Sequence, residues 1–371
     1  MNSLFSPLTF NRGPAMKNRF MLAPLTNQQS HDDGVCSDEE YTWLTKRAEG
    51  GFGLTMTCAA HVQAEGKGFP GQLGIFSDDH VPGLTRLAET IKANDSIAIV
   101  QLYHGGMRCP KDVIGMPPLC PSDNEKWGAR AMTTAEVEGM IEAFITAAER
   151  AERAGFDGVE LHGAHGYILA QFLSAEVNHR DDRYGGSLAN RQRPIREIID
   201  GIRKRCGSDF MLGVRLSPER FGMQLDEVVN LAALLMREEL IEFLDMSMWD
   251  VFKMPEDGGE DGKTLLAYFT ELERKGVRLG VAGKLRTPAE MQRALDLGAD
   301  WVMLGRAAIL HHNYPNLLSA DANFKPVELP VPAEHLHTEG LSDAFVDYMK
   351  NWKGFVKGND GFVDNDLILN S

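Results

Sequence analysis

Short apolar segments alternate with amphipathic segments along this chain, and the alternation recurs eight times within 371 residues. Each apolar segment spans only six or seven residues and is almost continuously hydrophobic. Runs of this length are typical of strands that are buried on both faces of a parallel sheet. The eight predicted strands are Arg19–Pro24, Gly53–Ala59, Ile97–Tyr103, Gly158–Gly163, Met211–Ser217, Glu242–Met248, Arg278–Gly283 and Trp301–Arg306.

Helical patterns fill the gaps between the predicted strands. Ser37 followed by Glu40 indicates a capping box at a helix start, and Gly50 marks the stop of that helix. A second start lies at Thr134, and that helix is predicted to end at Gly155. Further helices are predicted over residues 81–94, 188–207, 225–238, 263–276 and 287–298.

Eight β/α repeats are most simply arranged as a closed (β/α)₈ barrel, the TIM barrel of the α/β class. The competing architecture is a doubly wound open sheet, because strand order is not visible in a sequence. Such a sheet normally carries GxGxxG after its first strand. Here the first strand leads into "APLTNQQS" instead, so the sequence favours the barrel.

Two segments fall outside the repeat. Residues 104–132 are rich in Pro and Gly and are predicted to form an extended loop or hairpin over the barrel mouth. From about Ala320 the chain continues into a segment with one more helical pattern, over residues 341–355. We expect a single domain in which residues 1–319 form the barrel and residues 320–371 form an extension packed on it.

The charge balance limits the classes of partner. The net charge of −15, from 38 basic and 53 acidic residues, argues against nucleic acid or an anionic membrane. The five cysteines are widely spaced and form no CxxC pair, which suits free thiols in a reducing cytosol. We see no secretory signal and no apolar run near the ~18 residues of a membrane span. We therefore expect a cytoplasmic protein.

In barrels of this kind the functional side chains lie at the carboxyl ends of the strands. Gly283 ends the seventh predicted strand, and Gly305 with Arg306 ends the eighth. Backbone N–H groups at these two positions commonly hold a phosphate, to which a guanidinium adds a charge-assisted contact. The alternative is that the glycines only permit tight turns. Because both occupy the expected positions, phosphate binding is favoured.

Polar side chains also stand at the ends of other predicted strands. Arg215 lies in an apolar strand and needs an anionic partner, which is either a ligand or a neighbouring carboxylate such as Asp245. Gln101 is a buried amide that bonds either a ligand or the barrel backbone. Thr26 adds a hydroxyl at the mouth. Together these groups are suited to line a flat, polar-edged cofactor with a phosphate tail.

The fourth strand ends in "VELHGAHGY", which places His162, His165 and Tyr167 within six residues. Residues three apart on a strand point to opposite faces, so a shared metal would require a turn between the histidines. A third metal ligand would also be needed, and only Glu160 and Asp245 stand nearby at strand ends. Two buried structural histidines are another alternative. The tyrosine favours a third one, in which histidines polarise a substrate carbonyl and a phenol delivers a proton.

The residues around this motif resemble the Old Yellow Enzyme family of flavin-dependent ene-reductases. The most specific piece is "GVELHGAHGYILAQFLSAEVNHRDDRYGGSLANR", Gly158–Arg191. The segments "KNRFMLAPLT", "VQLYHGG" and "LGR" agree with it independently, so the similarity covers nearly the whole barrel. The resemblance implies a TIM barrel with tightly bound, non-covalent FMN at its mouth and NADPH or NADH as the reductant.

The resemblance also implies a role for each strand-end residue. His162 and His165 would bind the substrate carbonyl oxygen, and Tyr167 would be the proton donor. The implied reaction is the ping-pong reduction of the activated C=C bond of an α,β-unsaturated carbonyl compound. The implied FMN contacts are Pro24, Leu25, Thr26 and Ala59 at the isoalloxazine ring, Gln101 and Arg215 at its pyrimidine edge, and Gly283, Gly305 and Arg306 at the phosphate.

Three features differ from parts of that family. Some relatives carry Asn in place of the second histidine, and bacterial relatives often carry Cys where Thr26 stands. The tail "GFVKGNDGFVDNDLILNS" lacks the pattern by which some small relatives complete a neighbouring subunit's site, although a homo-oligomer is compatible with the sequence. The alternatives to an ene-reductase are another FMN barrel enzyme such as a hydroxy-acid oxidase, a metal-dependent barrel lyase and a non-catalytic binding barrel.

Overall fold

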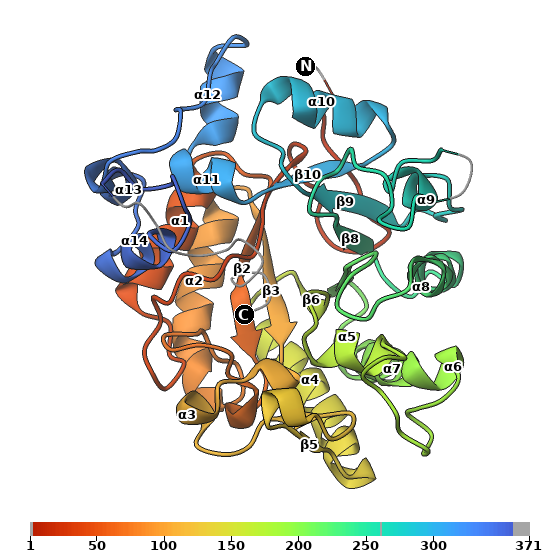
Figure 1. The fold of residues 1–371 in the computed structure, drawn as a ribbon. Coiled ribbons are helices and arrows are strands. Elements are labelled where there is room, and N and C mark those ends of the chain that lie inside the picture. The colour runs from red at the N-terminus through yellow and green to blue at the C-terminus, as the bar shows by residue number, and fades with distance from the viewer. Residues whose placement is uncertain (1–2, 260–261, 359–371) are drawn as a thin grey trace.

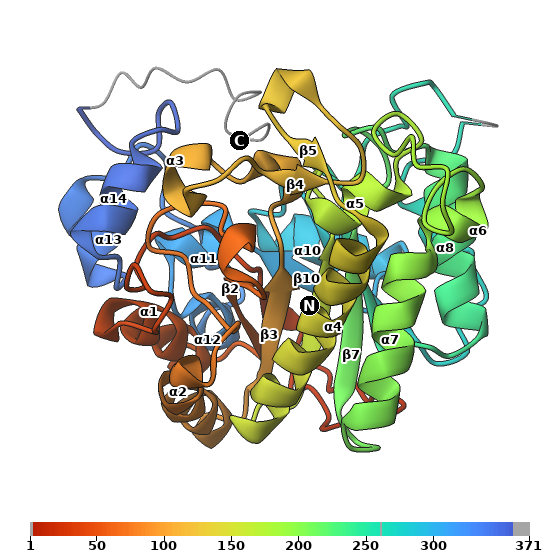
Figure 2. The ribbon, with the colours of Figure 1, turned by 90° about the horizontal axis from the view of Figure 1, so that it is seen from below.

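The computed structural model describes residues 3–259 and 262–358 and shows a closed barrel of parallel strands surrounded by helices (Figures 1 and 2). The strand order around the barrel is β1-β10-β9-β8-β7-β6-β3-β2, and β1 pairs in parallel with both β10 and β2. The expected (β/α)₈ barrel is therefore confirmed, and the open sheet is wrong. The barrel strands are β1 (Phe20–Leu22), β2 (Leu54–His61), β3 (Ile97–Tyr103), β6 (Gly158–Gly163), β7 (Met211–Leu216), β8 (Phe243–Ser247), β9 (Arg278–Ala282) and β10 (Trp301–Leu304).

The helices that follow the strands cover the outside of the barrel (Figure 1). Most of them match the predicted segments, but residues 263–276 form only the single turn α9, so the long helix predicted there is wrong. The helices are α1 (Asp38–Glu49), α2 (Val81–Ala93), α4 (Thr134–Arg153), α5 (Ile168–Leu173), α6 (Leu188–Arg191), α7 (Arg193–Arg205), α8 (Leu225–Arg237), α9 (Ala267–Thr270), α10 (Pro288–Asp296), α11 (Arg306–Leu310), α12 (Tyr314–Ala320), α13 (Ala333–Thr338) and α14 (Asp343–Met349).

The start of α1 differs from the predicted capping box. The Ser37 hydroxyl accepts a hydrogen bond from the Glu40 backbone N–H at 3.0 Å, as expected of an N-cap. The Glu40 side chain does not return the bond, because it is fully buried against the barrel. Half of the predicted reciprocal pair is therefore present. In α4 both halves form, between Thr133 and Glu136.

The segment between β3 and α4 lies at one end of the barrel, where Figure 2 shows α3, β4 and β5 together. It contains α3 (Lys111–Ile114), β4 (Leu119–Cys120) and β5 (Arg130–Ala131). Because β4 and β5 pair in parallel, these two strands form no hairpin, and the extended-loop alternative is the better description. At the other end of the chain, α13 and α14 lie beside α1 and α11 (Figures 1 and 2).

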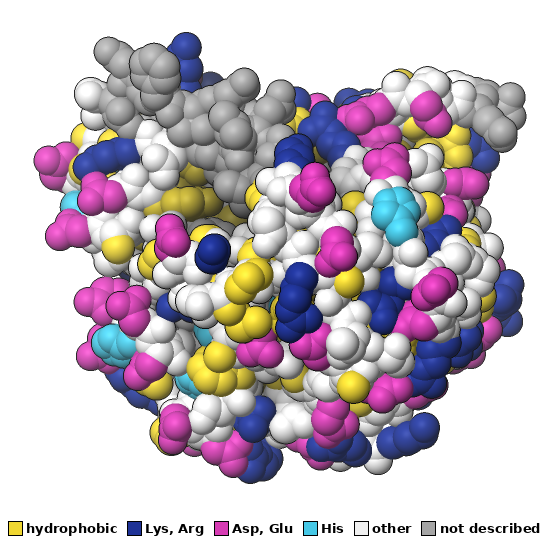
Figure 3. All heavy atoms as spheres, turned by 60° about the horizontal axis from the view of Figure 1, so that its bottom comes forward, with side chains coloured by type: hydrophobic (Ala, Val, Ile, Leu, Met, Phe, Trp, Pro, Cys, Tyr) yellow, Lys and Arg dark blue, Asp and Glu magenta, His cyan; other side chains and the backbone are white. Residues whose placement is uncertain are grey.

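Two apolar clusters hold the molecule together. The larger one lies between the strands and the helices, and the smaller one fills the barrel interior with side chains such as Met56, Met211, Phe243 and Trp301. The interior becomes polar toward the carboxyl ends of the strands. On the face shown in Figure 3, acidic and basic side chains are interspersed. Among the described residues, no helix is long and apolar enough to cross a membrane.

Candidate active site

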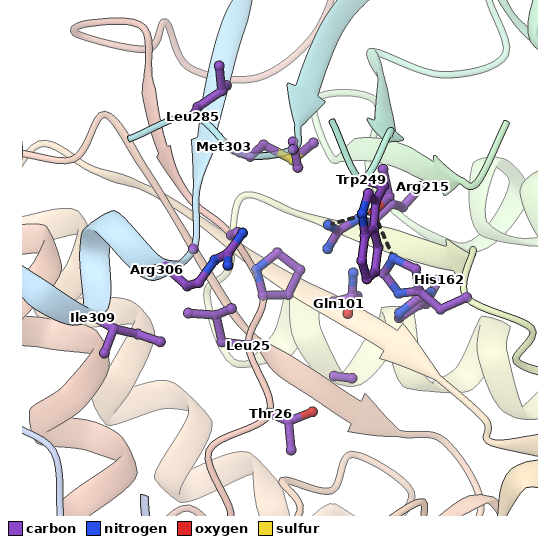
Figure 4. A pocket seen from close by; sticks show the side chains of 18 of the residues that line it. Leu25, Thr26, Gln101, His162, Arg215, Trp249, Leu285, Met303, Arg306 and Ile309 are labelled. Carbon is purple, nitrogen blue, oxygen red and sulfur yellow. Dashed lines mark hydrogen bonds between the residues drawn. The ribbon is translucent and has the colours of Figure 1, made fainter. Parts of the chain in front are cut away.

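All twelve residues predicted from the sequence line one cavity of about 620 Å³ at the carboxyl ends of the strands. This volume is within the usual range of small-molecule sites. Figure 4 shows Arg306 and Ile309 on one side of the cavity and Arg215, Trp249 and His162 on the other. The twelve residues are Pro24, Leu25, Thr26, Ala59, Gln101, His162, His165, Tyr167, Arg215, Gly283, Gly305 and Arg306.

The two histidines meet because the chain turns directly after β6. His165 has a φ of 59° and Gly166 a φ of 71°, so both adopt the left-handed conformation. The turn brings the two imidazole rings to 5.0 Å between centroids. The Ser217 hydroxyl accepts the His165 N–H at 3.0 Å, and the Arg108 guanidinium donates to the His165 carbonyl at 2.5 Å. These two bonds fix a conformation that is otherwise uncommon for a residue other than glycine.

Both imidazoles are neutral in this environment. Burial lowers the pKa of each histidine well below its usual range, and the positive charge of Arg215 lowers it further. The Ala164 N–H donates to Nδ1 of His162 at 3.3 Å, which leaves Nε2 to carry the proton. Nε2 of His165 lies 2.7 Å from the Ser247 hydroxyl. A neutral imidazole has one N–H group, so His162 can offer its Nε2–H, and His165 can offer Nδ1–H when the Ser247 hydroxyl donates to its Nε2.

Tyr167 caps the short helix α5 and faces the same cavity. Its ring lies 4.9 Å from the His162 ring and 4.5 Å from the Tyr103 ring, both edge-on. The Arg108 guanidinium stands 5.1 Å from the Tyr167 ring centroid, within reach of a cation–π contact. The phenol is thus held beside the histidine pair by packing on more than one side.

Arg215 and Gln101 form the polar floor of the cavity. Arg215 is buried, its Nη2 donates to Ser247 at 3.5 Å, and its Nε has no partner. No ion pair joins Arg215 to Asp245 among residues 3–259 and 262–358, so the internal ion pair considered as an alternative does not form. Gln101 donates to Glu160 at 2.6 Å, not to barrel backbone. Arg215 thus lines the cavity without a direct salt bridge, and the buried carboxyls of Glu160 and Asp245 act on its charge electrostatically.

The two predicted phosphate glycines differ in their surroundings. A Cβ at Gly283 would lie 2.8 Å from the backbone of Asp250, so this position needs glycine for packing as well. A Cβ at Gly305 would meet only Leu25, at 3.4 Å, so this backbone is open. Arg306 and Arg286 line the same end of the cavity, and the charge of Arg286 adds to burial in lowering the pKa of Arg306. Two like charges side by side favour an anionic ligand.

Sequence reasoning missed the contribution of the C-terminal extension. Tyr348, Met349 and Trp352 come from α14 and the turn after it, and they line the cavity. Burial raises the pKa of Tyr348 to about 12, against a hydrogen bond with Thr26 that lowers it. The only available signal was the aromatic content of "VDYMKNW", which does not indicate a contact with the first strand. The described part of the extension, residues 320–358, is thus part of the cavity wall as well as packing on the barrel, and residues 359–371 lie outside the described residues.

The fold and the cavity together define a class: a TIM-barrel protein whose one large strand-end site has a cationic end, an apolar middle and a histidine–tyrosine cluster. No group of three or more His, Cys, Asp or Glu residues able to hold a metal ion is found in the described part of the chain.

Comparisons with known proteins place the chain within this class. The sequence profile of the NADH:flavin oxidoreductase / NADH oxidase family matches residues 3–322. The probable NADH-dependent flavin oxidoreductase YqiG of Bacillus subtilis (strain 168) is 34% identical over 370 residues, covering 96% of this chain and 98% of that protein. The chain belongs to the NADH:flavin oxidoreductase / NADH oxidase family, and it is an NAD(P)H-dependent flavin oxidoreductase.

Solved structures agree with this assignment. An Old Yellow Enzyme homologue from Zymomonas mobilis superposes with a TM-score of 0.78 at 28% identity, covering 93% of this chain and 99% of the other. Morphinone reductase in complex with tetrahydroNAD superposes with a TM-score of 0.76 at 27% identity, covering 98% of each chain. The resemblance to the Old Yellow Enzyme family is therefore confirmed.

Proposed function

We propose that this enzyme uses FMN and NADPH or NADH to reduce the activated C=C bond of α,β-unsaturated carbonyl compounds by a ping-pong mechanism. The observation that carries the proposal is the convergence of His162, His165 and Tyr167 on one wall of the cavity. Two neutral N–H donors beside a phenol match the needs of a reaction that places charge on a carbonyl oxygen and a proton on carbon.

The residues that line the cavity fit FMN. Arg306 and Arg286 would hold the phosphate, with the open backbone at Gly305 beside them. Gln101 and Arg215 would hold the pyrimidine edge, because both side chains line the cavity. Pro24, Leu25, Thr26 and Ala59 would contact the ring. When bound, FMN supplies the hydride that passes from the nicotinamide to the β-carbon of the substrate.

The histidine pair binds and polarises the substrate. Because both imidazoles are neutral, each contributes an N–H hydrogen bond to the carbonyl oxygen, and these bonds strengthen as negative charge develops there. Each misplaced donor of this kind lowers the rate by about 10²–10³. Tyr167 then delivers a proton to the α-carbon from its position beside the His162 ring.

The absorption spectrum of the purified protein is the first test. A flavin band, present as isolated or after adding FMN, is expected. A protein that stays colourless with FMN contradicts the proposal. Turnover with oxygen on a hydroxy acid, without alkene reduction, would favour the oxidase alternative.

The second test separates the two half-reactions with Tyr167→Phe. This variant keeps the ring packing and removes only the hydroxyl, so alkene reduction is expected to slow by about 10²–10⁴ while flavin reduction by NADPH is nearly unchanged. Tyr41→Phe is the matched control, because its hydroxyl bonds Thr90 at 2.8 Å outside the cavity. Equal losses in both half-reactions of Tyr167→Phe would contradict the role as proton donor.

A further inference from the structure

Glu160 is the one charged residue of the "VELHGAHGY" motif to which the proposed mechanism gives no role. It lies on β6 with its side chain fully buried in the barrel interior, and Asp245 on β8 is equally buried. Both stand close beneath the cavity floor, because Glu160 pairs in register with Gln101 and Asp245 with Arg215. Gly280 of β9, in register with Asp245, leaves room for this carboxyl, because a Cβ there would overlap with Oδ1 of Asp245.

The hydrogen bonds around these two carboxyls are incomplete. Oε1 of Glu160 accepts from the Gln101 amide at 2.6 Å. Oε2 of Glu160 and both oxygens of Asp245 receive no N–H or hydroxyl hydrogen bond from the described residues. The two carboxyls interact directly with each other. Another donor left without a partner in the described part of the chain is the Nε1–H of Trp301, which lies beside Oδ1 of Asp245 at Gly280. Two buried carboxylates in contact repel each other, whereas one proton between them provides the missing donor.

Arg215 is the cation that acts on both carboxyls. Burial raises the pKa of Glu160 and of Asp245, the neighbouring Glu160 raises that of Asp245 further, and the positive charge of Arg215 opposes these shifts. Groups coupled this closely titrate as a pair. With one proton the buried set of Arg215, Glu160 and Asp245 is neutral, with none it carries a net negative charge, and with two it carries a net positive charge.

We propose that Glu160 and Asp245 share a single proton in the folded enzyme, and that the remaining negative charge balances Arg215 beneath the cavity. This inference rests on the proposed function for its consequence: the pair sets the net charge that Arg215 presents to bound FMN. Glu160 and Asp245 are thus positioning residues, which act on the cofactor through Arg215 and not by contact.

Substitutions that fix the charge distinguish the three protonation states. The midpoint potential of bound FMN reports how much more tightly the protein binds reduced FMN than oxidised FMN, expressed as the ratio of the two affinities. With one shared proton, Glu160→Gln and Asp245→Asn each leave one carboxylate, and the ratio should stay within about threefold of the parent enzyme. The double variant removes the balancing charge, and the ratio should rise at least about tenfold in favour of reduced FMN, about 30 mV for a two-electron couple.

Other outcomes overturn the proposal. If both carboxyls were ionised, each single variant would already raise the potential. If both were protonated, the double variant would leave it unchanged. Glu242→Gln is the matched control, because Glu242 is a fully buried acid that pairs with Arg12 and Arg203 away from the cavity. It should leave the potential unchanged, and a shift there would show that any buried acid has this effect.

Infrared difference spectroscopy tests the proton itself, even if FMN does not bind. A shared proton predicts a protonated-carboxyl band in the parent protein that disappears in both Glu160→Gln and Asp245→Asn. A band that survives in the single variants, or that is absent from the parent, refutes the shared proton. A protein that shows the band but binds no flavin would contradict the proposed function and leave the shared proton intact. Thermal unfolding confirms that each variant is folded.

Discussion

Replacing Glu40 by glutamine should stabilise this enzyme at alkaline pH and much less at acidic pH. Glu40 lies in the first turn of α1 with its side chain fully buried, and neither of its oxygens receives an N–H or hydroxyl hydrogen bond that satisfies it. Burial raises the pKa of this carboxyl to about 7, although contacts with Cys58 and Asn27 oppose the shift. The folded protein therefore holds a proton at neutral pH that the unfolded chain releases.

The direction of the pH effect follows from this difference. Below the ordinary pKa of glutamate the carboxyl is protonated in both states, and it does not change the balance between them. As the pH rises toward 7, the unfolded chain gains stability by ionising while the folded protein cannot, so the free energy of unfolding falls. Above the folded-state pKa both states are ionised, and the loss levels off at about 3 kcal/mol. Glutamine does not ionise, so the variant escapes this loss.

Urea unfolding of the parent enzyme and Glu40→Gln across this range measures the effect. Between about pH 5 and pH 8 the stability difference should move by about 2.5 kcal/mol in favour of the variant. Glu39→Gln is the matched control, because Glu39 is the exposed neighbour on the same helix. It should give a curve parallel to that of the parent. A constant difference between the parent and Glu40→Gln at every pH would refute the reasoning.

Three further predictions concern the cavity. Replacing both His162 and His165 by alanine should weaken the binding of phenolic ligands by at least about 10²-fold, since two hydrogen bonds are lost; unchanged binding in a fluorescence titration would show that the pair is structural. Arg306→Met should weaken FMN binding by about 10–100-fold by equilibrium titration, whereas the rim variant Lys284→Met should change it little. Arg108→Met removes the bond to the His165 carbonyl and should slow alkene reduction at least about tenfold in single turnovers; an equal slowing of flavin reduction would contradict this positioning role.

The strands of the barrel were predictable because their hydrophobicity is continuous. A strand buried on both faces leaves a signal that does not depend on its neighbours, and all eight predicted strands are present. Sequence patterns were less reliable where tertiary contacts determine where a strand or helix begins and ends. β2 continues to His61 past an irregularity between Met56 and Ala59, which no composition rule indicates. The predicted helix over residues 263–276 shrinks to one turn, where Leu265, Leu266 and Phe269 are buried.

The part of the site that is formed by residues at the carboxyl ends of the strands could be predicted from the sequence. Once the strands are located, the residues that follow them must gather at one end of the barrel, and the twelve predicted residues do line one cavity. Tyr348 and Trp352 could not be found this way, because they reach the cavity from α14 and the turn after it, more than 300 residues beyond Thr26 in the chain. Glu40 is the opposite case, in which a clear sequence pattern was misleading. Its type and its spacing from Ser37 predict a capping-box partner, but in the structure its side chain is buried and does not bond the N-cap.

The histidine pair shows why the geometry of one turn decides what the motif can do. Had β6 continued as a regular strand, His162 and His165 would face opposite sides of the barrel wall, and only one would reach the cavity. The left-handed conformations of His165 and Gly166 reverse this, and the bonds from Ser217 and Arg108 hold the turn in place. The second donor at the site therefore depends on residues outside the motif, namely Ser217 directly after β7 and Arg108 in the long segment after β3. For this reason the spacing of the histidines alone could not distinguish a metal site, a structural pair and a pair of hydrogen-bond donors.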